Sequence, residues 1–496
     1  MPSLGPAWTR AAAWLIALLS LSGCAAFRSY NAELGGTLGQ VSNGNVDGAI
    51  KVLESNNKGA NKDLLYYLEM GELQRLKDSY AASQKSWGSA QATVQVWEDT
   101  AKTDPSKLLG DAASYVVNDK LRPYEGHDYE KVMLTTGIAL NFLALGELDN
   151  ARVAIKQTHE LEAVIADLRS QETYKVEQEA RKRGATTSFK ELNGYPVQSI
   201  YNPAVNALKN SYQSALSHYL AGFVYEALDE PSLAAAGYRQ AIELQPNQPQ
   251  LEQALAGLDQ RVAAADDGLT DTLFVVGSGT APARESRQFA LPIPVNHTLV
   301  LVPVSLPVMQ VTSAGLLPGQ LEVDGVDRAP VTPVTNIDLM ARRALQDEMP
   351  GIMLRGAIRS TAKAVTQYGL EHQAQRKDNG LLGLAGIAVA IGSVVTESAD
   401  ERTWRSLPAQ IGIARTRLPP GTHTVTLHTS EGSHTFQFTV SGRYAVVGLR
   451  LMRGQLYVQA PVVSATIRAT DAARVLPVPR PPATAKQQQP PQEISR

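Results

Sequence analysis

The hydrophobic and polar residues follow a helical pattern through the first half of the chain and change to a strand pattern after Arg261. Up to about residue 265, small and apolar residues recur at the spacing of helix faces that pack on a core. The later segment TLVLVPVSLPVMQV, residues 298–311, is rich in valine and leucine with interrupting prolines, which is typical of β-strands. The pattern predicts an α+β chain of several domains, with helices first and strands second.

The strongest helical segment runs from His218 to Pro246. Its small and aromatic residues lie at the spacings of a tetratricopeptide (TPR) repeat, a pair of antiparallel helices about 34 residues long. The matching positions are Gly222, Tyr225, Ala234, Tyr238, Ala241 and Pro246. Small residues at these spacings let the two helices approach closely, while the aromatic rings fill the groove between neighbouring units.

Two weaker copies of this repeat precede it in the chain. The first carries Gly71 and Trp87, and the second carries Ala139, Phe142 and Ala151 at the corresponding positions. Since such a unit cannot bury its apolar face alone, three or more must stack. We therefore predict an irregular TPR-like array over residues 24–265. A plain helical bundle with the same periodicity is the alternative.

The second half contains several short strand patterns. They lie at residues 319–326, 410–418, 423–428, 434–440 and 444–450, and turns with glycine or proline separate the last four. Short strands with short connections form antiparallel sheets. We therefore predict a small antiparallel β-sandwich within residues 266–462. The Pro- and Gln-rich tail, residues 463–496, is predicted to be disordered.

A helical and apolar insertion, residues 336–397, interrupts the predicted strands. Residues 336–378 have the apolar spacing of core-facing helices, and the run from Asn379 to Glu397 is nearly all apolar with several glycines. Because this run is shorter than the roughly 20 residues that span a bilayer, the pattern favours burial against the sheets. A patch that contacts a membrane or a partner, and a membrane span, are the alternatives.

The N-terminus has the order of a secretory signal peptide. Arg10 is followed by an uncharged apolar run, Ala11 to Leu21, and then by small residues. The Leu-Ser-Gly-Cys quartet resembles the lipobox of bacterial lipoproteins, in which the cysteine is acylated and the peptide is cut before it. The resemblance implies a signal peptide over residues 1–23 and lipidation of Cys24, the only cysteine. An ordinary signal peptide with a chance cysteine is the alternative.

Charge and compartment agree with this picture. The formal net charge of −2 gives no electrostatic footprint for nucleic acid. A mature chain with no thiol besides Cys24 suits an oxidising compartment. Alanines follow Cys24, where lipoproteins retained in the inner membrane typically carry aspartate, so the resemblance implies the periplasmic face of the outer membrane.

Catalytic motifs are missing from the sequence. It contains no GxxxxGK[ST] phosphate loop, no GxSxG nucleophile elbow and no HExxH zinc helix. His423 and His428 are predicted to face opposite sides of a strand, so we expect no metal and no cofactor. Trp404 and Arg405, in DERTWRSLP, are the residues that we select for a possible partner contact, although a buried aromatic with a capping arginine more often explains such a pair.

Two stretches of the chain resemble signature blocks of an uncharacterised family of bacterial lipoproteins with TPR repeats. They are NDKLRPYEGHDYEKVMLTTGIALNFLALGELDNARVAI, residues 118–155, and ADERTWRSLPAQIGIARTRLPPGTH, residues 399–423. The resemblance covers most of the chain from Cys24 to about Pro461. The family has no established activity to carry over. In some bacteria its genes lie near those of penicillin-binding-protein activator lipoproteins, which hints at cell-envelope assembly.

These patterns together predict a non-enzymatic scaffold that is anchored to the outer membrane by acyl chains. Its concave repeat surface is expected to bind a peptide or helix of an unidentified envelope protein, and no nucleic acid. One alternative is an envelope enzyme that acts on glycan or peptidoglycan through scattered carboxylates. Another is a structural subunit of a secretion or surface-assembly complex.

Overall fold

The computed structural model describes residues 30–109, 122–183, 188, 192, 194–264, 267–295, 298–311, 315–377, 398–430 and 432–461. Side chains of residues 109, 183, 291–302 and 360–377 are not described. The predicted signal peptide with Cys24, the apolar run 379–397 and the tail after residue 462 lie outside these residues. The described chain combines helices and sheets, as the α+β prediction requires.

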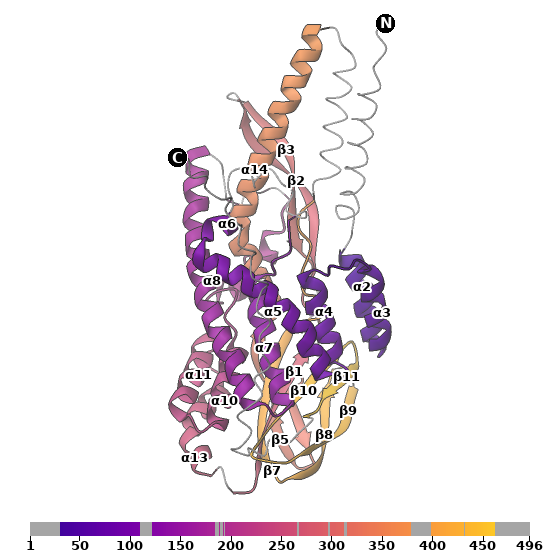
Figure 1. Cartoon of the computed structure of the whole chain (residues 1–496), viewed down its shortest axis with the longest axis vertical. Coiled ribbons are helices and arrows are strands. Elements are labelled where there is room, and N and C mark those ends of the chain that lie inside the picture. Colours follow the sequence, from indigo (N-terminus) through magenta and orange to yellow (C-terminus); the bar gives the residue numbers. More distant parts are fainter. Residues whose placement is uncertain are drawn as a thin grey trace, which may run out of the picture. The chain divides into compact units, whose positions relative to one another are not determined.

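Helices make up the described chain before residue 265. They are α2 (Tyr30–Ser42), α3 (Val46–Asn56), α4 (Leu64–Arg75), α5 (Tyr80–Thr103), α6 (Pro105–Leu109), α7 (Asp128–Ala144), α8 (Leu148–Arg183), the short η3 (Val197–Ser199), α9 (Pro203–Asn206), α10 (Ala215–Ala227), α11 (Pro231–Leu244), α12 (Pro249–Ala256) and α13 (Leu258–Ala263). Consecutive helices pack in pairs, α2 with α3, α4 with α5, α7 with α8, and α10 with α11 (Figure 1).

Close approach within these pairs depends on glycine facing an aromatic ring. Gly71 of α4 faces the indole of Trp87 of α5, and Gly222 of α10 faces the ring of Tyr238 of α11. Both rings are buried. Gly237 of α11 lies against the backbone of α10, where an added Cβ would meet the amide nitrogen of Gly222 at 2.6 Å. The predicted packing positions of the first and third units are therefore helix contacts.

The other predicted packing residues also lie in helices or at their ends. Ala139, Ala151, Ala234 and Ala241 are fully buried, Tyr225 is buried and Phe142 is partly buried against the core. Pro246 is exposed, two residues after the end of α11. All but Pro246 thus contribute to the packed interior.

The strands form three sheets. They are β1 (Thr270–Ser278), β2 (Arg284–Val295), β3 (Thr298–Met309), β4 (Gln320–Val323), β5 (Asp327–Pro330), β6 (Thr332–Asn336), β7 (Gln410–Leu418), β8 (Gly421–Thr429), β9 (Gly432–Val440), β10 (Tyr444–Met452) and β11 (Gln455–Gln459). The sheet orders are β11-β10-β1-β7-β6, β5-β4-β8-β9 and the hairpin β2-β3.

One strand pair departs from the antiparallel arrangement that we predicted. β10 pairs with β1 in parallel, while β1 pairs with β7 and β8 pairs with β9 in antiparallel fashion. The connection from β9 to β10 leaves one sheet and enters the other, where β10 meets the strand that arrives from the helices. Turn chemistry fixes only the pairing of adjacent strands, which is why the sequence did not reveal this partner.

A single long helix, α14 (Ile337–Lys377), occupies the first part of the predicted insertion. It follows β6 directly and contains Pro350. It packs beside the β2–β3 hairpin, where Gly356 faces Val304 of β3 (Figure 1). None of the described helices is long and apolar enough to cross a bilayer.

Two hydrophobic cores hold the elements together. The larger core contains residues of the helices, α14 and the β1-containing sheet, and the smaller core lies between the two larger sheets. In the smaller core, Phe274 of β1 meets Phe438 of β9 with ring centroids 5.4 Å apart. Because the larger core continues across the predicted boundary at residue 265, residues before and after it share one interior.

Candidate functional site

Two buried glutamates hold a loop that crosses the helices. This loop, residues 399–408, precedes β7, and we call it the Trp404 loop. Glu130 of α7 accepts a hydrogen bond from the Trp404 amide at 2.7 Å, and Glu69 of α4 accepts one from the Arg405 amide at 2.6 Å. Both carboxylates are fully buried. The loop is therefore fastened to two separate helix pairs by its own backbone.

The side chain of Trp404 lies in the core. It has no exposed surface, its ring packs edge-to-face on Trp87 at 5.9 Å, and its Nε1 donates to Ser406 Oγ at 2.9 Å. Arg405 is partly buried and donates from Nε to the carbonyl of Ala281 at 3.1 Å. In this conformation a partner cannot reach Trp404.

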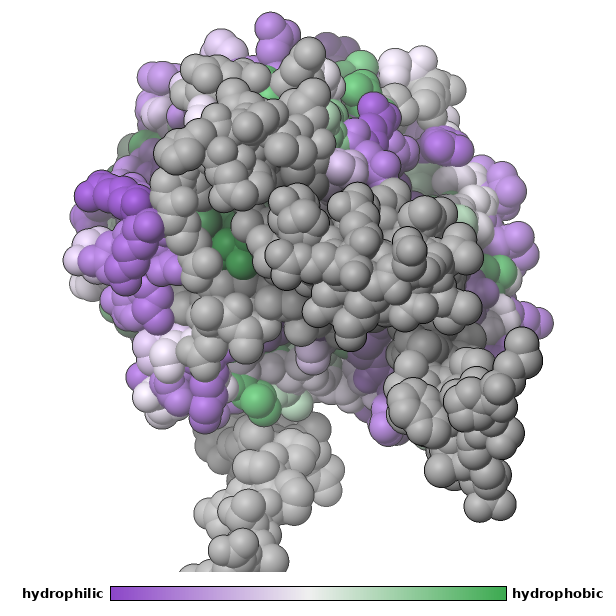
Figure 2. All heavy atoms as spheres, turned by 90° about the horizontal axis from the view of Figure 1, so that it is seen from above, coloured by the Kyte–Doolittle hydropathy of each residue, from purple (hydrophilic) through white to green (hydrophobic). Residues whose placement is uncertain are grey.

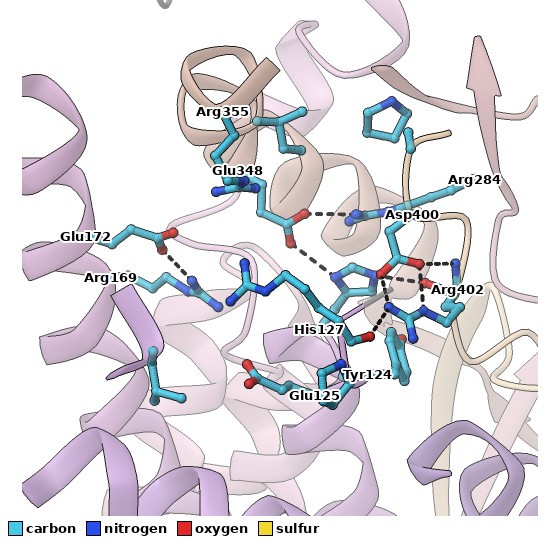
Figure 3. Close-up of a pocket in the computed structure, with 17 residues that line it drawn as sticks. Tyr124, Glu125, His127, Arg169, Glu172, Arg284, Glu348, Arg355, Asp400 and Arg402 are labelled. Carbon is cyan, nitrogen blue, oxygen red and sulfur yellow. Dashed lines mark hydrogen bonds and ion pairs between the residues drawn. The ribbon is translucent and has the colours of Figure 1, made fainter. Parts of the chain in front are cut away.

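A pocket of about 190 Å³ lies where this loop, the segment 122–127 before α7, α8, β2, β3 and α14 come together (Figure 3). Charged residues dominate its lining. They are Arg122, Glu125, His127, Arg169, Glu172, Arg284, Glu348, Arg355, Asp400 and Arg402. With five arginines and four carboxylates, the lining carries a small positive excess before any charge on His127 is counted.

Glu348 of α14 is the centre of one network in this pocket. Its Oε1 lies 3.1 Å from His127 Nδ1, and its Oε2 accepts from Arg284 Nη1 at 2.8 Å (Figure 3). The other ring nitrogen of His127, Nε2, lies 3.1 Å from the carbonyl oxygen of Arg402. A carboxylate and a carbonyl can only accept, so both contacts are hydrogen bonds when the imidazole carries two protons.

Arginine charge keeps Glu348 ionised. Burial alone would raise the pKa of this carboxyl, but the positive charges of Arg284 and His127 outweigh burial and hold the pKa well below its ordinary value. Glu348 is therefore a fixed negative charge rather than a proton donor at neutral pH.

The second network joins the Trp404 loop to the segment before α7. Arg402 binds Asp400 in a two-bond arrangement, with Nε to Oδ1 at 2.8 Å and Nη2 to Oδ2 at 2.7 Å. Its Nη2 also donates to the carbonyl of Arg122 at 2.9 Å, and its guanidinium lies over the Tyr124 ring. Arg402 thus holds two distant parts of the chain at one wall of the pocket.

Arg284 retains hydrogen-bonding capacity that its described neighbours leave unused. The side chain is almost completely buried, and its Nε and Nη2 have no hydrogen-bond partner among the described residues. A buried donor without a partner costs roughly 1–3 kcal/mol, and more when it is charged. An acceptor that enters the pocket, such as a carboxylate, would remove that cost.

A second pocket, of about 490 Å³, adjoins the first one between α8 and α14. The two pockets share Arg169, Glu172 and Glu348 as lining residues. Arg169 also binds Asp128 at 2.6 Å and 2.9 Å. Burial would raise the pKa of Asp128, but Arg169 and Lys131 lower it to about 2.

Arginines, carboxylates and one histidine supply the charged groups of the first pocket. Among the described residues that line the first pocket there is no serine, threonine, cysteine or lysine that could act as a nucleophile. The described residues also contain no group of three or more histidines and acids placed to hold a metal ion. His423, one of the two strand histidines considered in the sequence, contacts Asp324 at 2.6 Å and the carbonyl of Pro419 at 2.7 Å.

The two sequence blocks that carried the family resemblance meet in this pocket. Arg122, Tyr124 and His127 come from the first block, and Asp400 and Arg402 come from the second. From the sequence we selected Trp404 and Arg405, which lie beside the pocket rather than in its lining. The Arg-Pro-Tyr and Asp-Glu-Arg triplets were the available signal, because charged residues at loop positions often mark binding sites.

Glu348 and Arg284 gave no comparable signal. They lie on a helix and a strand whose residue patterns indicated only packing, and folding alone brings them to the pocket. Comparison of the chain with family models, curated proteins and solved structures found no significant match.

Proposed function

We propose that this chain is a lipid-anchored, non-enzymatic protein of the bacterial cell envelope that binds an acidic segment of another protein. The observation that carries the proposal is the arginine-rich pocket where residues 122–127 and 399–402 meet, with two guanidinium nitrogens of Arg284 that have no partner among the described residues. The lipobox-like Leu-Ser-Gly-Cys quartet, residues 21–24, supports the anchor. The periplasmic face of the outer membrane is the proposed address.

In this proposal α4–α5, α7–α8 and α10–α11 are TPR units, and the two larger sheets form a β-sandwich. The glycine–aromatic contacts Gly71–Trp87 and Gly222–Tyr238 support the first assignment. The shared core between the sheets supports the second. The TPR assignment also agrees with the family resemblance carried by residues 118–155 and 399–423.

The face that repeat arrays use for partners is occupied by the chain itself in this proposal. Every residue of α10 is buried, and so is every residue of α7 except Phe142. Phe223 of α10 packs on Tyr444 of β10 at 5.7 Å, and the Leu216 amide donates to Thr335 Oγ1 at 3.1 Å. We therefore assign partner binding to the pocket instead of to a concave groove.

The pocket favours a carboxylate-bearing ligand. Arg284 supplies buried donors, and the partly exposed Arg122 lines the same pocket. Guanidinium groups bind carboxylates through two parallel hydrogen bonds, which gives orientation as well as affinity. Aspartate or glutamate side chains in an exposed segment of an envelope protein meet this requirement.

The pocket gives little support to the alternative of a glycan-cleaving enzyme. Such enzymes use one carboxyl group with a raised pKa as an acid beside a second carboxylate. Here Glu172, Glu348 and Asp400 are each paired with an arginine. Glu125 is exposed. None of the described lining therefore supplies the required acid and base pair.

A crosslinking experiment in intact cells tests the proposal. A photocrosslinking residue at Glu125, on the exposed rim, is expected to capture a partner protein, whereas the same residue at Val326, in the exposed β4–β5 turn, is expected to capture much less. The substitution Arg122→Gln should reduce capture at the rim at least about tenfold, since a charge-assisted hydrogen bond contributes about 1.5–3 kcal/mol. Equal capture with and without the Arg122→Gln substitution would contradict the assignment of the pocket.

Membrane fractionation tests the lipid anchor separately. We expect Cys24→Ala to move the chain from the membrane fraction to the soluble fraction. Membrane association that survives this substitution would contradict lipid anchoring.

A further inference from the structure

The β2–β3 hairpin is an apolar ribbon that stands apart from the two larger sheets. No other described strand pairs with either of its edges. Each strand has 12 residues, and the sequence from Gln288 to Met309 contains no Asp, Glu, Lys or Arg. At about 3.4 Å per residue, the ribbon reaches roughly 40 Å from base to turn.

The base of the ribbon is firmly packed. Val304, Leu306 and Val308 of β3 are buried, and Val304 lies against Gly356 of α14. Closer to the turn, Gln288, Ala290 and Pro303 are exposed. The remaining residues of the ribbon end, 291–295 and 298–302, are mostly leucine, isoleucine, valine and proline.

Prolines protect both edges of this ribbon. The Ser286 amide donates to Glu401 Oε1 at 3.1 Å, outside the ribbon. In the pair Ser286–Pro307 the backbone N–H and C=O groups therefore point away from the partner strand, which we call outward. In an antiparallel ladder, the backbone groups of every second residue pair point outward in this way. The outward pairs nearer the turn are therefore Ala290–Pro303, Pro292–Leu301 and Pro294–Leu299.

All four prolines of the hairpin thus occupy outward positions, where they remove unpaired N–H groups. This arrangement prevents further strands from adding to the edges. It also lowers the number of bare donors that an apolar environment would have to accept.

The surface around this end of the molecule is different in character. Figure 2 views the molecule along the direction in which α14 extends in Figure 1, and the described side chains visible there are largely hydrophilic, with scattered apolar ones. The described surface visible from this side thus contrasts with the apolar sequence of the ribbon end.

The position of the N-terminal tether places a bilayer near the ribbon. Asn31, at the start of α2, hydrogen-bonds through Nδ2 to the carbonyl of Arg284 at the base of the ribbon. Cys24 precedes Asn31 by seven residues, which span at most about 25 Å when fully extended. A bilayer that holds an acylated Cys24 therefore lies within about 25 Å of the ribbon base, which is less than the length of the ribbon.

We propose that the strand ends Ala290–Val295 and Thr298–Pro303 enter the surface of the same bilayer that holds the acylated N-terminus. This inference rests on the lipid anchor of the proposed function. The apolar side chains favour the acyl region, while the outward carbonyls and the remaining outward N–H groups of Ala290, Leu299 and Leu301 keep the ribbon near the hydrated headgroups. Two attachment points then fix the orientation of the protein on the membrane.

The orientation has a consequence for the pocket. Arg284 and Pro307 line the pocket and also belong to the base of the ribbon. The pocket would therefore face the zone just above the lipid headgroups, where membrane-bound partners present their juxtamembrane segments.

A single fluorescent label tests this inference. Because Cys24 is the only cysteine and is acylated in the anchored protein, a second cysteine gives one labelling site. The acylated full chain carrying Ile293→Cys, or Val326→Cys as the matched control, is labelled with a polarity-sensitive nitrobenzoxadiazole dye. It is then reconstituted into vesicles of phosphatidylethanolamine and phosphatidylglycerol, which are recovered by flotation.

The inference predicts a blue-shifted label at residue 293 that brominated lipids quench and that dithionite reduces several-fold more slowly than the label at residue 326. A water-exposed label at residue 293 on protein that floats with the vesicles would overturn the inference and leave the anchor intact. Failure to float would overturn the anchor and the inference with it. A blue shift in native membranes that is absent in pure lipid vesicles would assign the ribbon to a protein partner instead.

Discussion

Glu69 joins α4 to the Trp404 loop through a single buried side chain. It is fully buried in α4 and accepts hydrogen bonds from the amides of Arg405 and Ser406 in the Trp404 loop. Burial raises its pKa from 4.5 to about 7, although the bonds from Ser406 and Arg405 act in the opposite direction. The folded chain therefore holds this proton at pH values where the unfolded chain has released it.

Replacing Glu69 with Gln should change stability in a pH-dependent way. The raised pKa means that the free energy of unfolding of the wild-type chain falls as the pH rises from about 4.5 through 7. Glutamine resembles the protonated carboxyl group and does not titrate. We expect nearly equal melting temperatures at pH 5 and a variant that is more stable at pH 8, by up to about 3 kcal/mol.

Thermal unfolding of the unacylated chain at the two pH values measures this difference. The exposed Glu252→Gln provides a control for the substitution itself and should change stability by less than about 0.5 kcal/mol. A Glu69→Gln variant that is less stable than the wild type at pH 8 would mean that the ionised carboxylate is needed to hold the loop.

The sequence could not have revealed this residue. Glu69 and Arg405 are 336 residues apart, and Glu69 occupies a helix position where a solvated charge is the ordinary expectation. Cys24, by contrast, was selected from the residues immediately before it, and its lipidation stays a prediction. Motifs formed by neighbouring residues can be predicted from the sequence, whereas a buried contact between distant polar residues depends on the final fold.

Helix pairs are the elements that sequence patterns predicted best. Gly222 and Tyr238 were selected from their spacing, and the structure places them in direct contact. The strands β7 and β10 begin at the predicted residues 410 and 444. The spacing did not identify Gly237, because no aromatic partner marks it. Its partner is the backbone of the neighbouring helix.

Substituting Gly237 with Ala should strongly destabilise the α10–α11 pair. The added Cβ would meet the Gly222 amide nitrogen at 2.6 Å and the His218 carbonyl oxygen at 2.8 Å. These are backbone atoms, so relief requires the helices to separate. Overpacking of this kind typically costs about 1–3 kcal/mol. Denaturant unfolding monitored by circular dichroism measures the loss.

Gly39→Ala is the matched control for this substitution. Gly39 is also a helix residue, in α2, and an added Cβ there would meet nothing within 4 Å. Since alanine favours a helix by about 1 kcal/mol over glycine, this variant should be as stable as the wild type or slightly more stable. Equal effects of the two substitutions would contradict the close approach of α10 and α11.

At the scale of the whole molecule, one buried charge cluster joins the helices to the sheet. Glu226 of α10 is fully buried and binds Arg261 at 2.7 Å and Arg415 of β7 at 2.8 Å. Arg415 also binds Asp271 of β1 at 2.6 Å. Burial would raise the pKa of Glu226, but Arg261 and Arg415 outweigh burial and lower it.

This cluster lies across the boundary that we predicted at residue 265. Composition and periodicity change there, and so the sequence indicated two domains. The contacts that unite them join residues far apart in the chain, such as Glu226 and Arg415, and no local pattern encodes such pairs. The helix surface that we expected to be free for a partner is, for the same reason, buried in α7 and α10.

A shared core predicts that the two halves unfold together. The unacylated chain of residues 25–496 should give one calorimetric transition whose van't Hoff and calorimetric enthalpies agree, because the larger core contains both helix and strand residues. Residues 25–265 alone would expose the apolar faces of α7 and α10. We expect this fragment to bind a hydrophobic dye strongly or to aggregate, and to regain helical structure when co-expressed with residues 267–461. Two separate transitions, or a monomeric fragment with full helicity and no dye binding, would mean that the helical array is an independent domain and that its concave face is available to partners after all.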